Sequence, residues 1–162
     1  SIKDRNMFEL DWSLTRHNGF LEHFTPQTFI GNHEDTRIAS ALGPDGALAA
    51  AAILLTVGGI PSIYYGDEQG FVGIKEQRLG GDDDVRPAFP NAPWELADWG
   101  RDIYRAHQEL VALRRRNPWL VTATTTALQI ENSRYCYRAQ AADGRAFMDV
   151  IVDLTVTPSV SI

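Results

Sequence analysis

The chain has little cysteine, no excess of positive charge and no long uninterrupted apolar run. Cys136 is the only cysteine among 162 residues, which excludes an internal disulfide framework and is typical of a reducing compartment. Fifteen Lys and Arg stand against 21 Asp and Glu, giving a net charge of −6, whereas general nucleic-acid binders need a basic surface. The most apolar stretch, residues 47–60, is too short and too rich in alanine and glycine to span a bilayer. We therefore expect no nucleic-acid partner and no membrane partner.

The N-terminus, SIKDRNMF, has neither an initiating methionine nor an apolar signal segment. We therefore expect the chain to begin inside a longer protein. The compartment stays open, and we favour a cytoplasmic location from the single cysteine and the lack of a visible signal. An apolar content of 44% is enough for a folded core and excludes general disorder.

Helix and strand patterns alternate over the first two thirds of the chain. Helical spacing covers residues 5–23, 36–42, 47–57 and 99–116, and the first of these helices is expected to fray or break near Asn18-Gly19. Two short β-branched and aromatic runs predict strands at 27–32 and 60–66. Because both runs are apolar on both faces, they favour a parallel sheet covered by helices, which is an α/β arrangement.

Two parts of the chain after residue 70 depart from this alternation. Residues 71–93 are rich in Gly, Pro and Asp and predict a long irregular loop. From residue 120 onward, β-branched and aromatic runs are separated by turn residues at 131–133 and 142–144. We therefore predict an antiparallel β module after the last helix.

A polar cluster, FIGNHEDTR, follows the first predicted strand at residues 29–37. Ligands of α/β proteins bind beyond the carboxyl ends of the strands, so this position favours a functional site. A metal site is disfavoured, because neighbouring residues on an extended chain point to opposite faces and the spacing differs from H-E-x-x-H. The alternative is that His33 and one carboxylate only cap a helix over 36–42.

TFIGNHEDTRIAS at 28–40, followed by GGIPSIYYGDEQG at 58–70, resembles two signature segments of the α-amylase superfamily, glycoside hydrolase family thirteen. In that family the first segment ends the seventh strand of a (β/α)8 TIM barrel and the second forms the eighth. The helix ending in ALRRRNPWL is similar to the last barrel helix. The resemblance implies the C-terminal part of the catalytic barrel at 1–118 and the start of a C-terminal β-sandwich domain at 119–162.

The resemblance also implies a retaining mechanism on α-glucosidic bonds, which uses three carboxylates. Asn32, His33 and Arg37 match positions expected to contact an α-glucan or maltodextrin. The acid that stabilises the transition state belongs directly after the histidine, where Glu34 stands in place of the family's aspartate. Asp35 is the alternative acid, and the His33-to-Arg37 spacing of the family favours Glu34 over it.

The nucleophile and the general acid of the family lie upstream of anything present here. A full barrel takes about 250 residues, so we expect a fragment that is inactive alone and that has the N-terminal part of the barrel as a partner. The alternative is a degenerate member that binds glucan or protein without catalysis. The parent would be an α-amylase, α-glucosidase or cyclomaltodextrinase type of enzyme.

Three further features have competing interpretations. We expect no cofactor; calcium stays open for the intact parent, although the run 82–84 favours a solvated acidic loop because its aspartates do not alternate. Tyr64 and Tyr65 are more typical of a core than of a site. Trp94 and Trp99 suit either stacking on sugar rings or packing of the last helix.

Overall fold

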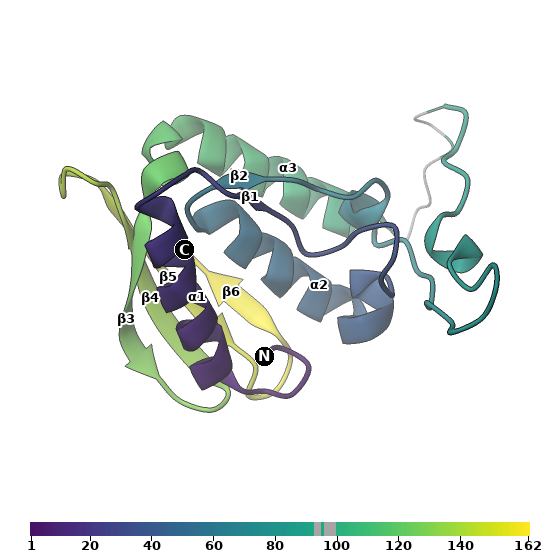
Figure 1. Cartoon of the computed structure of the whole chain (residues 1–162), viewed down its shortest axis with the longest axis horizontal. Coiled ribbons are helices and arrows are strands. Elements are labelled where there is room, and N and C mark those ends of the chain that lie inside the picture. Colours follow the sequence, from purple (N-terminus) through teal and green to yellow (C-terminus); the bar gives the residue numbers. More distant parts are fainter. Residues whose placement is uncertain (93–94, 96–99) are drawn as a thin grey trace.

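The computed structural model describes residues 1–92, 95 and 100–162 (Figure 1). Trp94 and Trp99 lie outside the described residues, so neither interpretation of them is tested. The helices are α1 (Met7–Leu21), α2 (Ile38–Thr56) and α3 (Arg101–Arg116), with 3-10 turns η1 (Asp67–Gln69), η2 (Asp83–Val85) and η5 (Pro118–Thr122). The strands are β1 (Gln27–Thr28), β2 (Ile60–Pro61), β3 (Thr124–Ile130), β4 (Arg134–Gln140), β5 (Phe147–Asp153) and β6 (Ser159–Ser161).

β1 and β2 pair in parallel, as predicted, with Gln27 opposite Ile60. Both strands are shorter than the predicted ranges 27–32 and 60–66. Each has a single paired neighbour among the described residues, so no second ladder of hydrogen bonds prolongs it. Beyond the pairing, Ser62 N donates to Thr28 O at 2.7 Å, and the ladder of backbone bonds between the two segments ends there.

α1 runs unbroken through Asn18-Gly19, so the predicted break there is wrong. Asn18 explains the continuity, because its side chain donates to Thr125 O at 2.7 Å and accepts from Thr125 N at 2.9 Å. These two bonds fasten the last turns of α1 to the start of β3. At the other end, the Asn6 side chain accepts from Glu9 N and caps the helix.

α2 consists of two helical segments separated by a kink at Gly43, whose φ of 73° is the left-handed conformation that glycine tolerates. The predicted interruption between 36–42 and 47–57 is therefore confirmed. By length and composition alone this helix could cross a membrane, yet 56% of its most apolar window is buried inside the structure. The alanine-rich second segment packs as a core helix.

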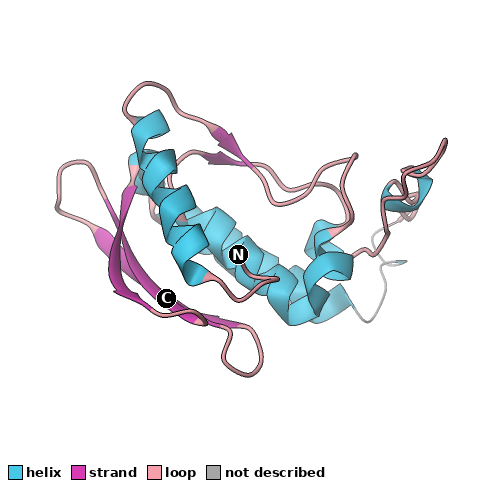
Figure 2. Cartoon of the chain, turned by 60° about the horizontal axis from the view of Figure 1, so that its bottom comes forward, coloured by secondary structure: helices cyan, strands magenta, loops and turns pink. Residues whose placement is uncertain are grey.

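Strands β3, β4, β5 and β6 form an antiparallel sheet in sequence order, which confirms the predicted β module and its two turns. Figures 1 and 2 show α1 and α2 lying against one face of this sheet. The main core contains Met7, Leu10 and Leu14 of α1, Ile53 and Val57 of α2, and Tyr135, Tyr137, Val150, Val152 and Leu154 of the sheet segment. The β module and the helices therefore share one core.

Arg114 of α3 connects three backbone carbonyls at the junction of α2 and β2. Its Nη1 donates to Leu55 O at 3.0 Å and to Val57 O at 2.8 Å, and its Nη2 donates to Gly59 O at 2.6 Å. Burial lowers the pKa of the Arg114 guanidinium, and the negative end of the α2 dipole offsets part of that cost. The side chain thus caps α2 and fixes the entry into β2.

We expect the substitution Arg114→Met to lower the free energy of unfolding by about 3 kcal/mol, because three buried carbonyls lose their hydrogen-bond donor. Urea denaturation followed by circular dichroism measures this change. The matched control is Arg115→Met, at an exposed arginine of the same turn, for which we expect a change below about 0.5 kcal/mol. Equal losses in the two variants would contradict the assignment.

Candidate functional site

The polar segment 29–37 leaves β1 at the carboxyl end of the parallel pair, next to the segment that leaves β2. A pocket of ≈ 250 Å³ lies between them. Phe29, Asn32 and His33 line it from the β1 side, and Ile63 and Tyr64 line it from the β2 side. The parallel pairing therefore brings the two sequence segments to one place, as the strand prediction requires.

Asn32 and Asp35 hold the backbone turn that carries the site. The Asn32 Oδ1 accepts from Glu34 N at 2.7 Å, and its Nδ2 donates to the Asp35 carboxylate at 2.6 Å. This is the Asx geometry by which an asparagine side chain takes the place of a backbone turn. Asp35 is thus occupied within the turn, and the Asn32 side chain has both polar atoms engaged there.

His33, Glu34 and Asp35 are all exposed, and His33 and Glu34 are the two whose side chains take no part in the hydrogen bonds of the turn. The His33 Nε2 lies 3.7 Å from a Glu34 Oε1, with side-chain exposures of 62% and 73%. Arg86 of the following loop donates from Nε to His33 O at 3.0 Å and holds the backbone from the other side. An imidazole and a carboxylate side by side on an open surface can together donate to and accept from the hydroxyl groups of a ligand.

Arg37 lies elsewhere, because its side chain has no exposed surface. Its Nη1 donates to Tyr65 O at 2.6 Å and to an Asp67 Oδ1 at 3.0 Å. The guanidinium also lies 4.1 Å from the ring centre of Tyr64. Arg37 therefore holds the two segments together and is not among the residues that line the pocket, and its expected contact with a substrate stays a prediction.

Two residues that contact each other here, Asp67 and Gly31, were not identified from the sequence. Asp67 is the carboxylate that accepts from Arg37. Burial raises the pKa of the Asp67 carboxyl, while the hydrogen bond and charge of Arg37 act in the opposite direction. Asp67 belongs to the second of the two quoted segments, 58–70, and Gly31 belongs to the first, 28–40. The only signal in a single sequence would have been a small residue in one segment and an acid in the other.

The residues around η1 have structural partners. Glu68 accepts from Gly66 N at 2.8 Å and from the Gln69 side chain at 3.0 Å, and it therefore supports the backbone of η1. The Tyr65 hydroxyl donates to Pro87 O at 2.8 Å. Tyr64 packs on Arg37 and also lines the pocket. Its ring therefore has both a packing contact and a surface that faces the candidate site.

The acidic loop contains ion pairs with cationic side chains. Asp82 lies 3.6 Å from Lys75 Nζ and also pairs with Arg86. In the described part of the chain, no three His, Cys, Asp or Glu side chains are grouped to hold a metal ion. The loop therefore supports the backbone of His33 through Arg86.

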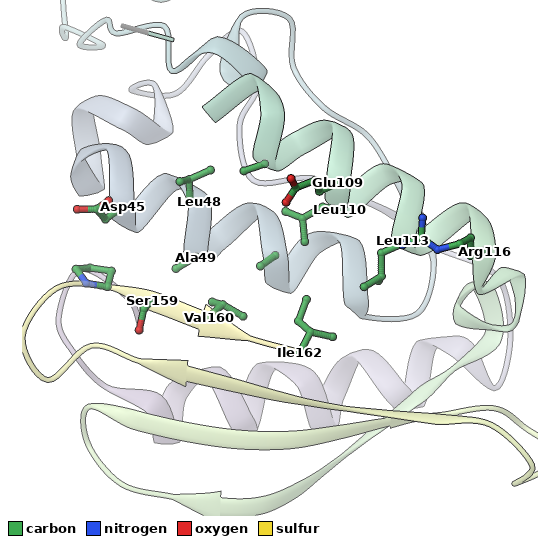
Figure 3. Close-up of a pocket in the computed structure, with 13 residues that line it drawn as sticks. Asp45, Leu48, Ala49, Glu109, Leu110, Leu113, Arg116, Ser159, Val160 and Ile162 are labelled. Atoms are coloured by element: carbon green, nitrogen blue, oxygen red, sulfur yellow. The ribbon is translucent and has the colours of Figure 1, made fainter. Parts of the chain in front are cut away.

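A larger groove of ≈ 560 Å³ lies between α2, α3 and β6, and it shares no lining residue with the pocket at His33 (Figure 3). Leu48, Leu110, Leu113, Val160 and Ile162 line much of it. Its wall is mainly aliphatic, whereas the clustered polar groups lie at the carboxyl ends of β1 and β2. The smaller pocket is therefore the candidate site.

Comparisons with known proteins agree on one family. The family model described as alpha amylase, catalytic domain, matches residues 3–125. The cyclomaltodextrin glucanotransferase of Bacillus licheniformis is 30% identical over 158 residues, covering 96% of this chain and 20% of the relative. The alpha-amylase of Streptomyces lividans is 31% identical over 153 residues, covering 77% of this chain and 16% of the relative. The chain thus spans about a fifth of the length of these relatives.

Solved structures show the same likeness. The cyclomaltodextrin glucanotransferase CldA, described as having a three-domain ABC distribution, matches with a TM-score of 0.74 and 30% identity, covering 93% of this chain and 29% of that chain. AmyP in complex with maltose matches with a TM-score of 0.76, covering 90% of this chain and 34% of that one. At 22% identity, the match to AmyP is evidence for the fold alone.

We expect the substitution Asn32→Ala to loosen the 32–35 turn, because Glu34 N and Asp35 both lose their partner. Hydrogen exchange measured by NMR should show about tenfold faster exchange at the Glu34 amide, with unchanged protection in β4 and β5. The control is Asn132→Ala, at an exposed asparagine of the β3–β4 turn. Unchanged exchange at Glu34 in the Asn32 variant would refute the turn assignment.

Proposed function

Because the chain belongs to the alpha-amylase catalytic-domain family, we propose that it is part of a retaining enzyme that acts on α-glucosidic bonds. The enzyme is a hydrolase or transglycosylase of α-glucans or maltodextrins. His33 and Glu34 belong to its substrate site. The relatives, a cyclomaltodextrin glucanotransferase and an alpha-amylase, support this substrate class.

The observation that carries the proposal is the exposed pair His33 and Glu34 beside the pocket at the carboxyl ends of β1 and β2. Active sites of (β/α)8 enzymes are built at that face of the barrel. The pair is carried by a turn in which Asn32 bonds Glu34 N and one oxygen of Asp35, so His33 and Glu34 are the side chains left outside the hydrogen bonds of the turn.

Each side chain has a distinct role in the proposed mechanism. The His33 imidazole donates a hydrogen bond to a hydroxyl of the sugar whose bond is cleaved. The Glu34 carboxylate accepts from neighbouring hydroxyls and stabilises the positive charge that develops in the oxocarbenium-like transition state. The nucleophile and the general acid come from the remaining part of the barrel.

Glu34 is one methylene longer than the aspartate of the family pattern, which moves the carboxylate by about 1 Å and can cost about 100-fold in rate. Asp35 is the less suitable acid, because one oxygen of its carboxylate is bonded to Asn32 within the turn. The second candidate function, binding of glucan without catalysis, is favoured by this longer acid. The two functions differ in what replacement of Glu34 does to turnover.

In the full-length parent, we expect Glu34→Gln to lower kcat/KM for maltodextrin by about 100-fold or more, since a charge that stabilises the transition state is lost. We expect Glu34→Asp to raise kcat, because the carboxylate returns to the shorter reach of the family pattern. Steady-state kinetics with maltotriose or a p-nitrophenyl α-maltoside measures both changes.

The matched control for these variants is Asp35→Asn, which alters the neighbouring carboxylate and is expected to change kcat/KM by only a few-fold. A parent that retains its glucan affinity but shows no turnover, with no response to either Glu34 variant, supports the binding function. Full activity in Glu34→Gln would contradict a catalytic role for this position.

The remaining part of the barrel is the proposed partner of this chain. Phe29 and Ile60 are 56% and 55% exposed beside the open β1–β2 pair. Phe8, Trp12 and Phe20 are likewise exposed on α1. Apolar surface of this extent is typical of an interface, and the flanking strands and helices of a barrel would cover it.

We expect the purified 162-residue chain to release no p-nitrophenol from p-nitrophenyl α-glucosides, because the other two carboxylates lie outside it. The assay compares the chain with a buffer blank and with an active α-amylase over several hours. Release above the blank that disappears in Glu34→Gln would show that this chain is catalytic alone.

A further inference from the structure

We propose that Arg37 and Asp67 form a positioning pair, which holds the His33–Glu34 turn in a fixed relation to the segment that follows β2. The inference rests on the proposed function only for the role of His33 and Glu34. Arg37 is not among the residues that line the pocket. It acts on the site through the backbone of the turn.

Arg37 joins three loops around the site. Its backbone N donates to Gly73 O at 3.0 Å. Its side chain bonds Tyr65 O and Asp67, which both belong to the segment after β2. Since Arg37 is four residues after His33, its anchoring limits the movement of the turn at the C-terminal end.

Gly31 limits the same turn at its N-terminal end. A Cβ added at Gly31 would lie 2.6 Å from an Asp67 Oδ2, closer than atoms in contact can approach. The Asp67 carboxylate therefore occupies the space in which a side chain of residue 31 would begin. Asp67 contacts Gly31 before the turn and Arg37 after it, so a single carboxylate brackets His33 and Glu34.

The hydrogen bonding of the pair is incomplete, which argues against a role in stability alone. Among the described residues, Arg37 Nε, Arg37 Nη2 and Asp67 Oδ2 are buried and have no hydrogen-bond partner. The rings of Tyr64 and Tyr65, at 4.1 and 4.9 Å from the guanidinium carbon, compensate part of the buried charge. A buried ion pair of this kind is a weak source of stability and is better suited to fixing one geometry.

The test uses NMR on the purified chain with the variants Asp67→Asn and Gly31→Ala. The first removes the charge that faces Arg37, and the second displaces Asp67 without altering either charged residue. We expect the amides of Glu34 and Arg37 to exchange at least about tenfold faster in both variants. The His33 ring resonance, assigned with His33→Gln, should shift in both, while amides of β4 and β5 stay within about twofold.

The matched control is Asp149→Asn, which breaks the ion pair of Asp149 with Arg138 on the sheet, at 2.7 and 2.8 Å. It should leave the Glu34 and Arg37 amides and the His33 resonance unchanged. The double variant Gly31→Asp with Asp67→Ala returns a carboxylate to the same space from the other segment. It should restore slow exchange in the turn.

Two results would overturn the proposal. The first is an unchanged turn in both Asp67→Asn and Gly31→Ala. The second is equal loss of protection in the turn and in β4 and β5, which would show a general stabilising role. Glucan turnover is no part of this readout, so failure of the proposed function and failure of the positioning pair are seen in separate experiments.

Discussion

The arrangement of the chain depends on the contact of the Arg114 guanidinium with three carbonyls at the end of α2. An arginine stays charged when buried. The buried N–H groups of Arg114 therefore need hydrogen-bond acceptors from the protein in place of water. Leu55, Val57 and Gly59 supply them. Because these carbonyls belong to the end of α2 and to the entry into β2, one side chain of α3 sets where the second parallel strand begins. The register of β1 against β2 follows from that start.

A second buried arginine repeats this principle at the carboxyl ends of the strands. Arg37 joins the segment after β1 to the segment after β2, as Arg114 joins α2 to β2. Arg114 thus fixes the segment that enters β2, and Arg37 joins the segments that leave β1 and β2. The exposed His33 and Glu34 therefore lie on a short turn whose ends are held by buried charge, although the parallel sheet itself has only two strands in the described chain.

The sequence predicted the element types and the parallel and antiparallel pairings, because periodicity and turn residues are local signals. It also located the polar turn, since a strand end followed by His33 and Glu34 is visible in one segment. The burial of Arg37 was not predicted, because it depends on residues 27 to 30 positions away. The coupling of Gly31 to Asp67 is likewise invisible locally. The lengths of β1 and β2 were overestimated because apolar character does not show whether a neighbouring strand is present.

Stability and chemistry lie in different parts of this fragment. The main core is formed by α1, α2 and the antiparallel sheet, and β1 and β2 contribute no buried residue to it. The candidate site lies beyond β1 and β2. The antiparallel sheet packs against α1 and α2 and can hold them in place although the parallel sheet has only two strands in the described chain. The shared core therefore explains how a piece that spans about a fifth of its relatives keeps the two signature segments together. Phe29 and Ile60 lie outside that core and stay exposed beside the site, because β1 and β2 have no further paired strand among the described residues.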